Sequence, residues 1–145
     1  MRRLITFACE GAELRATLDS GGDAVGLVMV TGGSQTRIGS HRMYERLAKA
    51  LAERGLSCLP SDRRGVGDSE GTDPGFRGSR PELQAALAAL RAEAPELRRA
   101  YGFGLCDGAT ALALFGAEAG LDGAILVNPW LAEAEAGARP RPAIR

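Results

Sequence analysis

The chain has 145 residues, which is enough for one domain with a substantial core and too few for two ordinary domains. Hydrophobic residues make up 45% of the sequence and charged residues 25%, the usual balance of a globular protein in water. The formal net charge is zero, because 18 basic residues balance 18 acidic ones. This balance argues against a nucleic-acid or membrane-surface partner, since binding sites for such partners usually need a surplus of positive charge.

The first residues begin like a secretory signal, with two arginines before a short apolar run. Glu10 and Glu13 end that run early, and no small-residue cleavage site follows it. No stretch of the sequence approaches the roughly 20 consecutive apolar residues that a membrane span needs. We therefore expect a cytoplasmic protein.

Two short strands are predicted first, at residues 4–9 and 12–18, joined by the turn-forming pair Glu10 and Gly11. They predict an antiparallel hairpin. Residues 25–31, VGLVMVT, are almost continuously apolar, which is typical of a strand buried on both faces of a parallel sheet.

An amphipathic helix is predicted next, because residues 42–54 carry apolar side chains at helical spacing and Gly55 follows them. Residues 56–60 predict another short strand, and the polar, glycine-rich residues 61–78 predict a long loop.

A second helix is predicted to begin at Ser79. Ser79 and Glu82 have the spacing of a capping box, in which each side chain bonds the backbone N–H of the other residue. Leu83, Leu87 and Leu90 mark the buried stripe of this helix.

The last predicted elements are a strand at residues 100–105, a helix at 107–119 and a strand at 123–128. This alternation predicts right-handed βαβ crossovers, and hence an α/β fold with a mostly parallel sheet covered by helices on both faces. Apolar periodicity then ends, so we expect residues 1–130 to form the domain and residues 131–145 to be a disordered or loosely packed tail.

The strongest chemical signal is Gly104-Leu105-Cys106-Asp107-Gly108, between the predicted strand and helix. A nucleophile elbow has this context: a sharp turn holds its central residue in a strained conformation, and flanking glycines avoid clashes. The N-terminus of the following helix favours negative charge on the sulfur. Cys106 is therefore a candidate nucleophile, and the alternative is a plain tight turn with a buried cysteine.

The other two cysteines, Cys9 and Cys58, lie in apolar, strand-like runs and are expected to be small buried core residues. An odd number of cysteines, without a CxxC or histidine-rich pattern, argues against both a disulfide framework and a zinc site. We expect neither a metal ion nor a cofactor.

Residues 31–34, Thr-Gly-Gly-Ser, come at the end of the third predicted strand. In a hydrolase, backbone N–H groups of such a loop, together with that of the residue after the nucleophile, here Asp107, stabilise an oxyanion. The alternative is a glycine-rich turn without a ligand.

A third polar segment, DRRGVGDS at residues 62–69, follows the fourth predicted strand. In this order, VMVTGG, DRRGVGDS and GLCDG resemble the α/β-hydrolase superfamily. More closely, GGSQTRIGSHRMYERLAKALAERG followed by DRRGVGDSEG and FGLCDGATALALFG is similar to the hydrolases associated with the exosortase A system, which belong to bacterial exopolysaccharide and protein-sorting gene clusters. The resemblance extends from about residue 1 to 130.

This resemblance implies an α/β-hydrolase with its nucleophile at Cys106 and its oxyanion donors at Gly33 or Ser34 and at Asp107. Serine is the usual nucleophile of the superfamily. A cysteine suits esters, thioesters or lactones, as in the dienelactone hydrolases, which the chain resembles only at the elbow. The resemblance implies a small-molecule acyl substrate without identifying it.

The remaining members of a catalytic triad are missing, because the chain order is nucleophile, acid, histidine and no histidine follows Cys106. We therefore expect a sheet truncated before its last strands, with residues 123–128 as an unprotected edge. His41, in the loop after VMVTGG, is one candidate base. The alternative is a catalytically inactive half-domain that binds a partner or a second copy through this edge.

Arg37 is a candidate for binding an anionic group of the substrate. It belongs to a cluster of arginines in the two loops at the same end of the predicted sheet. The alternative is that these loops are simply polar, as surface loops usually are.

Overall fold

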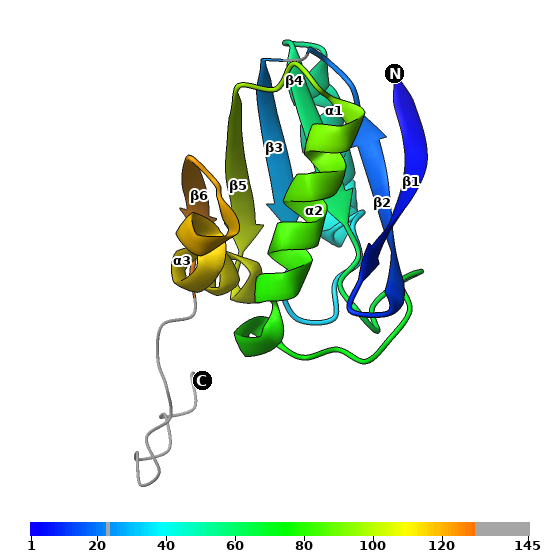
Figure 1. The fold of residues 1–145 in the computed structure, drawn as a ribbon, viewed down its shortest axis with the longest axis vertical. Coiled ribbons are helices and arrows are strands. Elements are labelled where there is room, and N and C mark those ends of the chain that lie inside the picture. Colours follow the sequence, from blue (N-terminus) through cyan, green and yellow to red (C-terminus); the bar gives the residue numbers. More distant parts are fainter. Residues whose placement is uncertain (23, 130–145) are drawn as a thin grey trace, which may run out of the picture.

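The structure, a computed structural model, describes residues 1–22 and 24–129 (Figure 1). In chain order its elements are β1 (Arg2–Cys9), β2 (Ala12–Asp19), β3 (Val25–Val30), a 3-10 turn (Ser40–Arg42), α1 (Met43–Ala52), β4 (Leu56–Ser61), a second 3-10 turn (Phe76–Gly78), α2 (Arg80–Glu93), β5 (Arg99–Leu105), α3 (Asp107–Ala119) and β6 (Gly123–Val127). The tail predicted at residues 131–145 lies outside the described residues.

The six strands form one sheet in the order β1-β2-β4-β3-β5-β6. β3 pairs in parallel with β4 on one side and β5 on the other, and β6 continues the parallel part beyond β5. β1 and β2 form the predicted antiparallel hairpin, which joins the sheet through β4. The prediction of a mostly parallel α/β sheet is confirmed.

Helices cover both faces of the sheet, as predicted. In Figure 1, α2 crosses the front of the sheet and α1 lies behind it. Successive side chains of β3 point to opposite faces. On the face of α1 the core contains Leu27, Met29, Tyr44, Ala48 and Cys58. On the opposite face it contains Val28, Val30 and Leu59 with Leu83, Leu87 and Leu90 of α2 and Leu112 of α3.

The start of α2 lies where the sequence predicts it, but the predicted capping box is wrong. Ser79 already has a helical conformation, with φ −84° and ψ −5°, and its hydroxyl donates to the carbonyl of Phe76 at 2.6 Å. The carboxylate of Glu82 instead accepts the backbone N–H of Arg64 at 2.9 Å. Because the 3-10 turn before α2 already gives Ser79 a helical backbone conformation, its side chain cannot reach the backbone N–H of the third helical residue.

Tyr44, on α1, connects the two central strands at their carboxyl ends. Its hydroxyl donates to the carbonyl of Val30 at 2.8 Å and accepts the N–H of Leu105 at 3.2 Å. The ring is fully buried and packs edge-on against Phe103, with 5.6 Å between ring centroids. Burial raises the pKa of Tyr44 to about 12, so the hydroxyl remains protonated and able to donate. One side chain thus holds the end of β3 beside the end of β5.

β6 forms an edge of the described sheet, as the sequence predicts for this strand. Its apolar side chains are exposed: Ile125 by 55%, Leu126 by 41% and Val127 by 39%. Within the described part of the chain, no further strand pairs with its outer edge.

Replacing Tyr44 with phenylalanine removes the hydroxyl and keeps the ring. We expect the free energy of unfolding to fall by about 1–3 kcal/mol, because the Val30 carbonyl and the Leu105 N–H lose their common partner. Urea denaturation measures this loss. The matched control is Tyr101→Phe on β5, a half-buried residue whose hydroxyl has no hydrogen bond within the described residues. Equal losses in the two variants would contradict the assigned role of Tyr44.

Candidate active site

Cys106 lies at the sharp turn from β5 into α3. Its backbone has φ 56° and ψ −121°, a conformation that residues other than glycine rarely adopt. Its N–H donates to the carbonyl of Val127 at 3.0 Å, and its carbonyl accepts the N–H of Thr110 at 3.1 Å. The side chain is exposed, whereas Cys9 and Cys58 are buried as predicted. The exposed thiol removes the alternative of a buried cysteine in a plain turn.

The glycines on either side of this turn are required by close backbone contacts. A Cβ atom at Gly104 would lie 2.6 Å from the carbonyl carbon of Gly108. A Cβ atom at Gly108 would lie 2.3 Å from the carbonyl oxygen of Val30, at the end of β3. Both separations are shorter than van der Waals contact, so the turn can form only with glycine at these positions.

The loop of residues 31–34, which we call the glycine loop, lies against this turn. A Cβ atom at Gly32 would lie 2.7 Å from the carbonyl oxygen of Leu105 and 3.0 Å from the backbone nitrogen of Asp107. Gly33 and Ser34, which follow, are exposed, and the space beside Gly33 is open. The structure therefore brings the predicted oxyanion donors and Cys106 to the same end of the sheet. The sequence prediction did not single out Gly32 as the residue that contacts the turn, although a glycine just after a buried strand was a usable signal.

Arg63, in the loop after β4, contacts the glycine loop through its guanidinium. Its side chain is only 6% exposed, and its guanidinium donates to the carbonyl oxygen of Gly33. The same guanidinium forms two hydrogen bonds with the carboxylate of Asp73, at 3.1 and 3.2 Å. From the sequence, Arg63 is only one of the arginines predicted to cluster in the two loops, because nothing in the sequence indicates which carbonyl it contacts.

Arg37 is paired with two carboxylates of the neighbouring loop. The fully buried Asp62 accepts its backbone N–H at 2.6 Å and also its guanidinium, and Asp68 lies 2.9 Å from the same guanidinium. The Arg37 side chain is 12% exposed. These contacts explain Arg37 as a link between two loops, and the geometry gives no support to the predicted contact with an anionic substrate.

His41 lies in the turn before α1 and is exposed. It lines a surface depression together with Ser40, Met43 and Arg46. Within residues 1–22 and 24–129, no hydrogen bond or ion pair joins His41 to Cys106. The role of His41 as base therefore stays a prediction.

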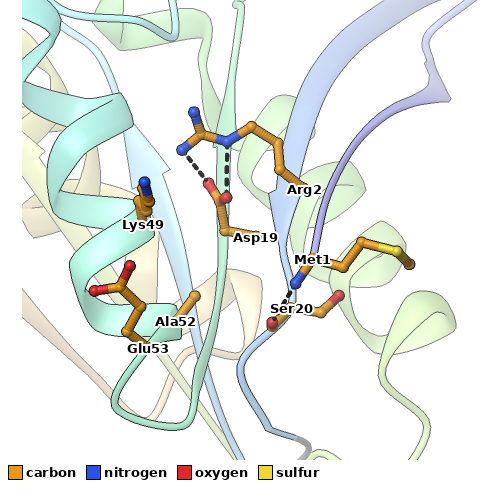
Figure 2. A pocket seen from close by; sticks show the side chains of 7 residues that line it. All are labelled: Met1, Arg2, Asp19, Ser20, Lys49, Ala52 and Glu53. Atoms are coloured by element: carbon orange, nitrogen blue, oxygen red, sulfur yellow. Dashed lines mark hydrogen bonds and ion pairs between the residues drawn. The ribbon is translucent and has the colours of Figure 1, made fainter.

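A hollow of ≈ 370 Å³ lies at the opposite end of the sheet (Figure 2). It is lined by Met1, Arg2, Asp19, Ser20, Lys49, Ala52 and Glu53. Arg2 and Asp19 satisfy each other through two hydrogen bonds of 2.8 and 2.9 Å, drawn as dashed lines in Figure 2. Ligands of open α/β sheets bind at the carboxyl ends of the strands. This hollow lies at the amino ends of the parallel strands, since Asp19 pairs with Cys58 near the start of β4. We therefore assign its charged side chains a structural role and not a ligand-binding one.

None of the helices in the described residues is long and apolar enough to cross a membrane. Over the same ranges, 1–22 and 24–129, no three histidine, cysteine, aspartate or glutamate side chains gather as a group that could hold a metal ion.

Comparison with known proteins gives both a family and structural neighbours. Residues 23–144 match the family described as "Serine aminopeptidase, S33". The α/β-hydrolase GrgF from Penicillium sp. sh18 is 26% identical with a TM-score of 0.76, over 89% of this chain and 46% of that one. The esterase Pf2001 from Pyrococcus furiosus is 20% identical with a TM-score of 0.77, over 89% and 49% of the two chains. Est1E from Butyrivibrio proteoclasticus, solved with ferulic acid bound, is 20% identical with a TM-score of 0.67, over 79% and 47%.

The chain spans about half the length of these three structures. At 20% identity, the likeness to Pf2001 and Est1E shows a shared fold. No curated protein matches the sequence.

The close contact between Gly108 and β3 can be tested by mutation. We expect Gly108→Ala to lower the free energy of unfolding by about 3 kcal/mol or more, because the new methyl group would overlap the Val30 carbonyl. The matched control is Gly116→Ala in the same helix, where the nearest atoms to the new Cβ would be 3.6 Å away. There, alanine should stabilise the helix by roughly 0.5–1 kcal/mol. Urea denaturation of both variants measures the difference, and a neutral Gly108→Ala would refute the contact.

Proposed function

The chain belongs to the serine aminopeptidase S33 family of α/β-hydrolases, and on that premise we propose that it cleaves the acyl bond of a small ester or thioester with Cys106 as nucleophile. The observation that carries this proposal is the exposed thiol on a strained strand-to-helix turn, with the glycine loop and the N-terminus of α3 beside it. The family description names a serine, so a cysteine at this position is the specific feature of the proposal.

The proposed reaction begins with attack of the Cys106 thiolate on the carbonyl carbon, which forms a C–S bond and places negative charge on the carbonyl oxygen. The N–H of Asp107 and that of Gly33 or Ser34 stabilise this oxyanion. Collapse of the tetrahedral intermediate breaks the bond to the leaving group, which departs with the electron pair. Water then hydrolyses the acyl-cysteine and regenerates the thiol.

In the whole enzyme we place the triad acid and histidine after β6, because the chain order in this fold is nucleophile, acid, histidine. His41 is not given this role, since it precedes Cys106 in the chain and the triad histidine of this fold follows the nucleophile. An ester substrate is favoured over a peptide by the thiol and by the esterase among the similar structures.

The cellular setting is also part of the proposal. Residues 32–55, 62–71 and 103–116 carry the similarity to exosortase-associated hydrolases. We therefore propose that the protein acts in the cytoplasm on an acyl substrate of an exopolysaccharide or protein-sorting system.

The reactivity of Cys106 tests the nucleophile. We expect iodoacetamide to alkylate Cys106 first, because Cys9 and Cys58 are buried, and p-nitrophenyl acetate to acylate it with release of p-nitrophenolate. Mass spectrometry locates both modifications, and absorbance follows the release. Cys106→Ala should abolish both reactions, whereas the matched control Cys9→Ala should leave them unchanged. Release of p-nitrophenolate at the same rate from Cys106→Ala would remove the proposal.

A second candidate function is favoured by the exposure of Ile125, Leu126 and Val127 on β6. An exposed apolar edge strand is a template for pairing with another chain. In this candidate, the protein is a catalytically inactive half-domain that pairs through β6 with a partner or a second copy.

Light scattering tests this second candidate. Pairing through β6 predicts a dimer that Leu126→Lys converts to a monomer, because a charged side chain would be buried at the new interface. The matched control is Leu114→Lys on α3, which is also exposed and lies off the sheet edge. A wild-type monomer at all accessible concentrations would count against self-pairing.

A further inference from the structure

Arg63 is a buried cation held in place by two kinds of partner. Its guanidinium contacts the Gly33 carbonyl on one side and the Asp73 carboxylate on the other. Asp73 is itself oriented, because one of its oxygens accepts the N–H of Gly75 at 2.8 Å. A buried guanidinium is costly without such partners. The direction of the Gly33 carbonyl is therefore set by a fixed charged group.

The Gly33 carbonyl and the Ser34 N–H belong to one peptide bond. Because that bond is planar and trans, its C=O and its N–H point in opposite directions. A contact that fixes the carbonyl of Gly33 thereby fixes the N–H of Ser34.

The sheet order decides which way this N–H points. β3, which leads into the glycine loop, lies between β4 and β5. Arg63 follows β4, whereas Cys106 follows β5. A Gly33 carbonyl directed at Arg63, on the β4 side, therefore favours a Ser34 N–H directed to the side of Cys106.

We infer that Arg63, anchored by Asp73, is a positioning residue that orients the Ser34 N–H as an oxyanion donor toward Cys106. This inference rests on the proposed function, and it selects Ser34 from the two candidates in the glycine loop. In this role Arg63 acts through the peptide bond between Gly33 and Ser34, and not by contact with the reacting atoms. Its removal would free the peptide between Gly33 and Ser34 to rotate, since the space beside Gly33 is open and Ser34 is exposed.

Two reagents separate this role from a general effect on the thiol. Acylation by p-nitrophenyl acetate passes through an oxyanion: the C–S bond forms, the ester C–O bond breaks and p-nitrophenolate leaves. Alkylation by iodoacetamide is a displacement of iodide at a saturated carbon and has no oxyanion. Neither reaction needs a triad histidine when the thiolate is supplied by alkaline buffer, so the chain can be tested as it is.

In Arg63→Met we expect the second-order rate constant for acylation of Cys106 to fall at least tenfold, while alkylation stays within twofold of wild type. Removal of a whole oxyanion donor costs roughly 10²–10³ in rate, and misorientation should cost a large part of that. Arg63→Lys keeps a cation and a donor and should recover part of the acylation rate. The matched control is Arg64→Met, since Arg64 contacts Glu10, Glu82 and the Gly78 carbonyl and not the glycine loop.

The rates of acylation and alkylation distinguish a failure of this inference from a failure of the proposed function. Unchanged acylation in a folded Arg63→Met, or an equal fall in both reactions, would overturn the inference and leave the proposed function standing. Acylation of Cys106→Ala at the wild-type rate would remove the proposed function and this inference with it. If circular dichroism shows that Arg63→Met does not fold, Asp73→Asn tests the same link, because Asp73 is 37% exposed and its loss releases Arg63. It should lower acylation selectively, and an unselective effect would overturn the inference.

Discussion

The contact between the end of β3 and the turn from β5 into α3 determines the geometry of the candidate site. Gly108 approaches the Val30 carbonyl so closely that no side chain fits between them, and the Tyr44 hydroxyl links the same carbonyl to the N–H of Leu105. These contacts hold two carboxyl ends of parallel strands side by side. The exposed thiol after β5 and the glycine loop after β3 therefore become neighbours through close backbone packing and the Tyr44 hydroxyl.

Charged side chains hold the loops at this end of the sheet in place. Asp62 receives two donors from Arg37, and Asp73 receives two from Arg63. Loops carry backbone carbonyls and N–H groups that apolar side chains cannot satisfy. Arginine can satisfy a carbonyl and a carboxylate together, which allows a glycine-rich loop to keep one conformation while its own N–H groups remain available for a ligand.

The fold was predictable from the sequence where the signal is local. The apolar run at β3, the spacing of leucines in α2 and the change from strand to helix at Cys106 each depend on neighbours in the chain, and each predicted its element to within about two residues. The failures have a different cause. Ser79 and Glu82 have the spacing of a capping box, but Glu82 bonds Arg64 from a distant loop. Arg37 looked free for a substrate, but Asp62 and Asp68 occupy it.

The sequence by itself determined the element types, the alternation that requires a mostly parallel sheet, and the placement of a cysteine between two glycines at a strand-to-helix turn. Those features follow from side-chain periodicity and from backbone sterics within a few residues. Only the tertiary structure decided that Gly32 lies against the turn and that Arg63 holds the Gly33 carbonyl. These are contacts between residues up to tens of positions apart, and they arise when the sheet order brings strand ends together, an ordering that no local pattern encodes.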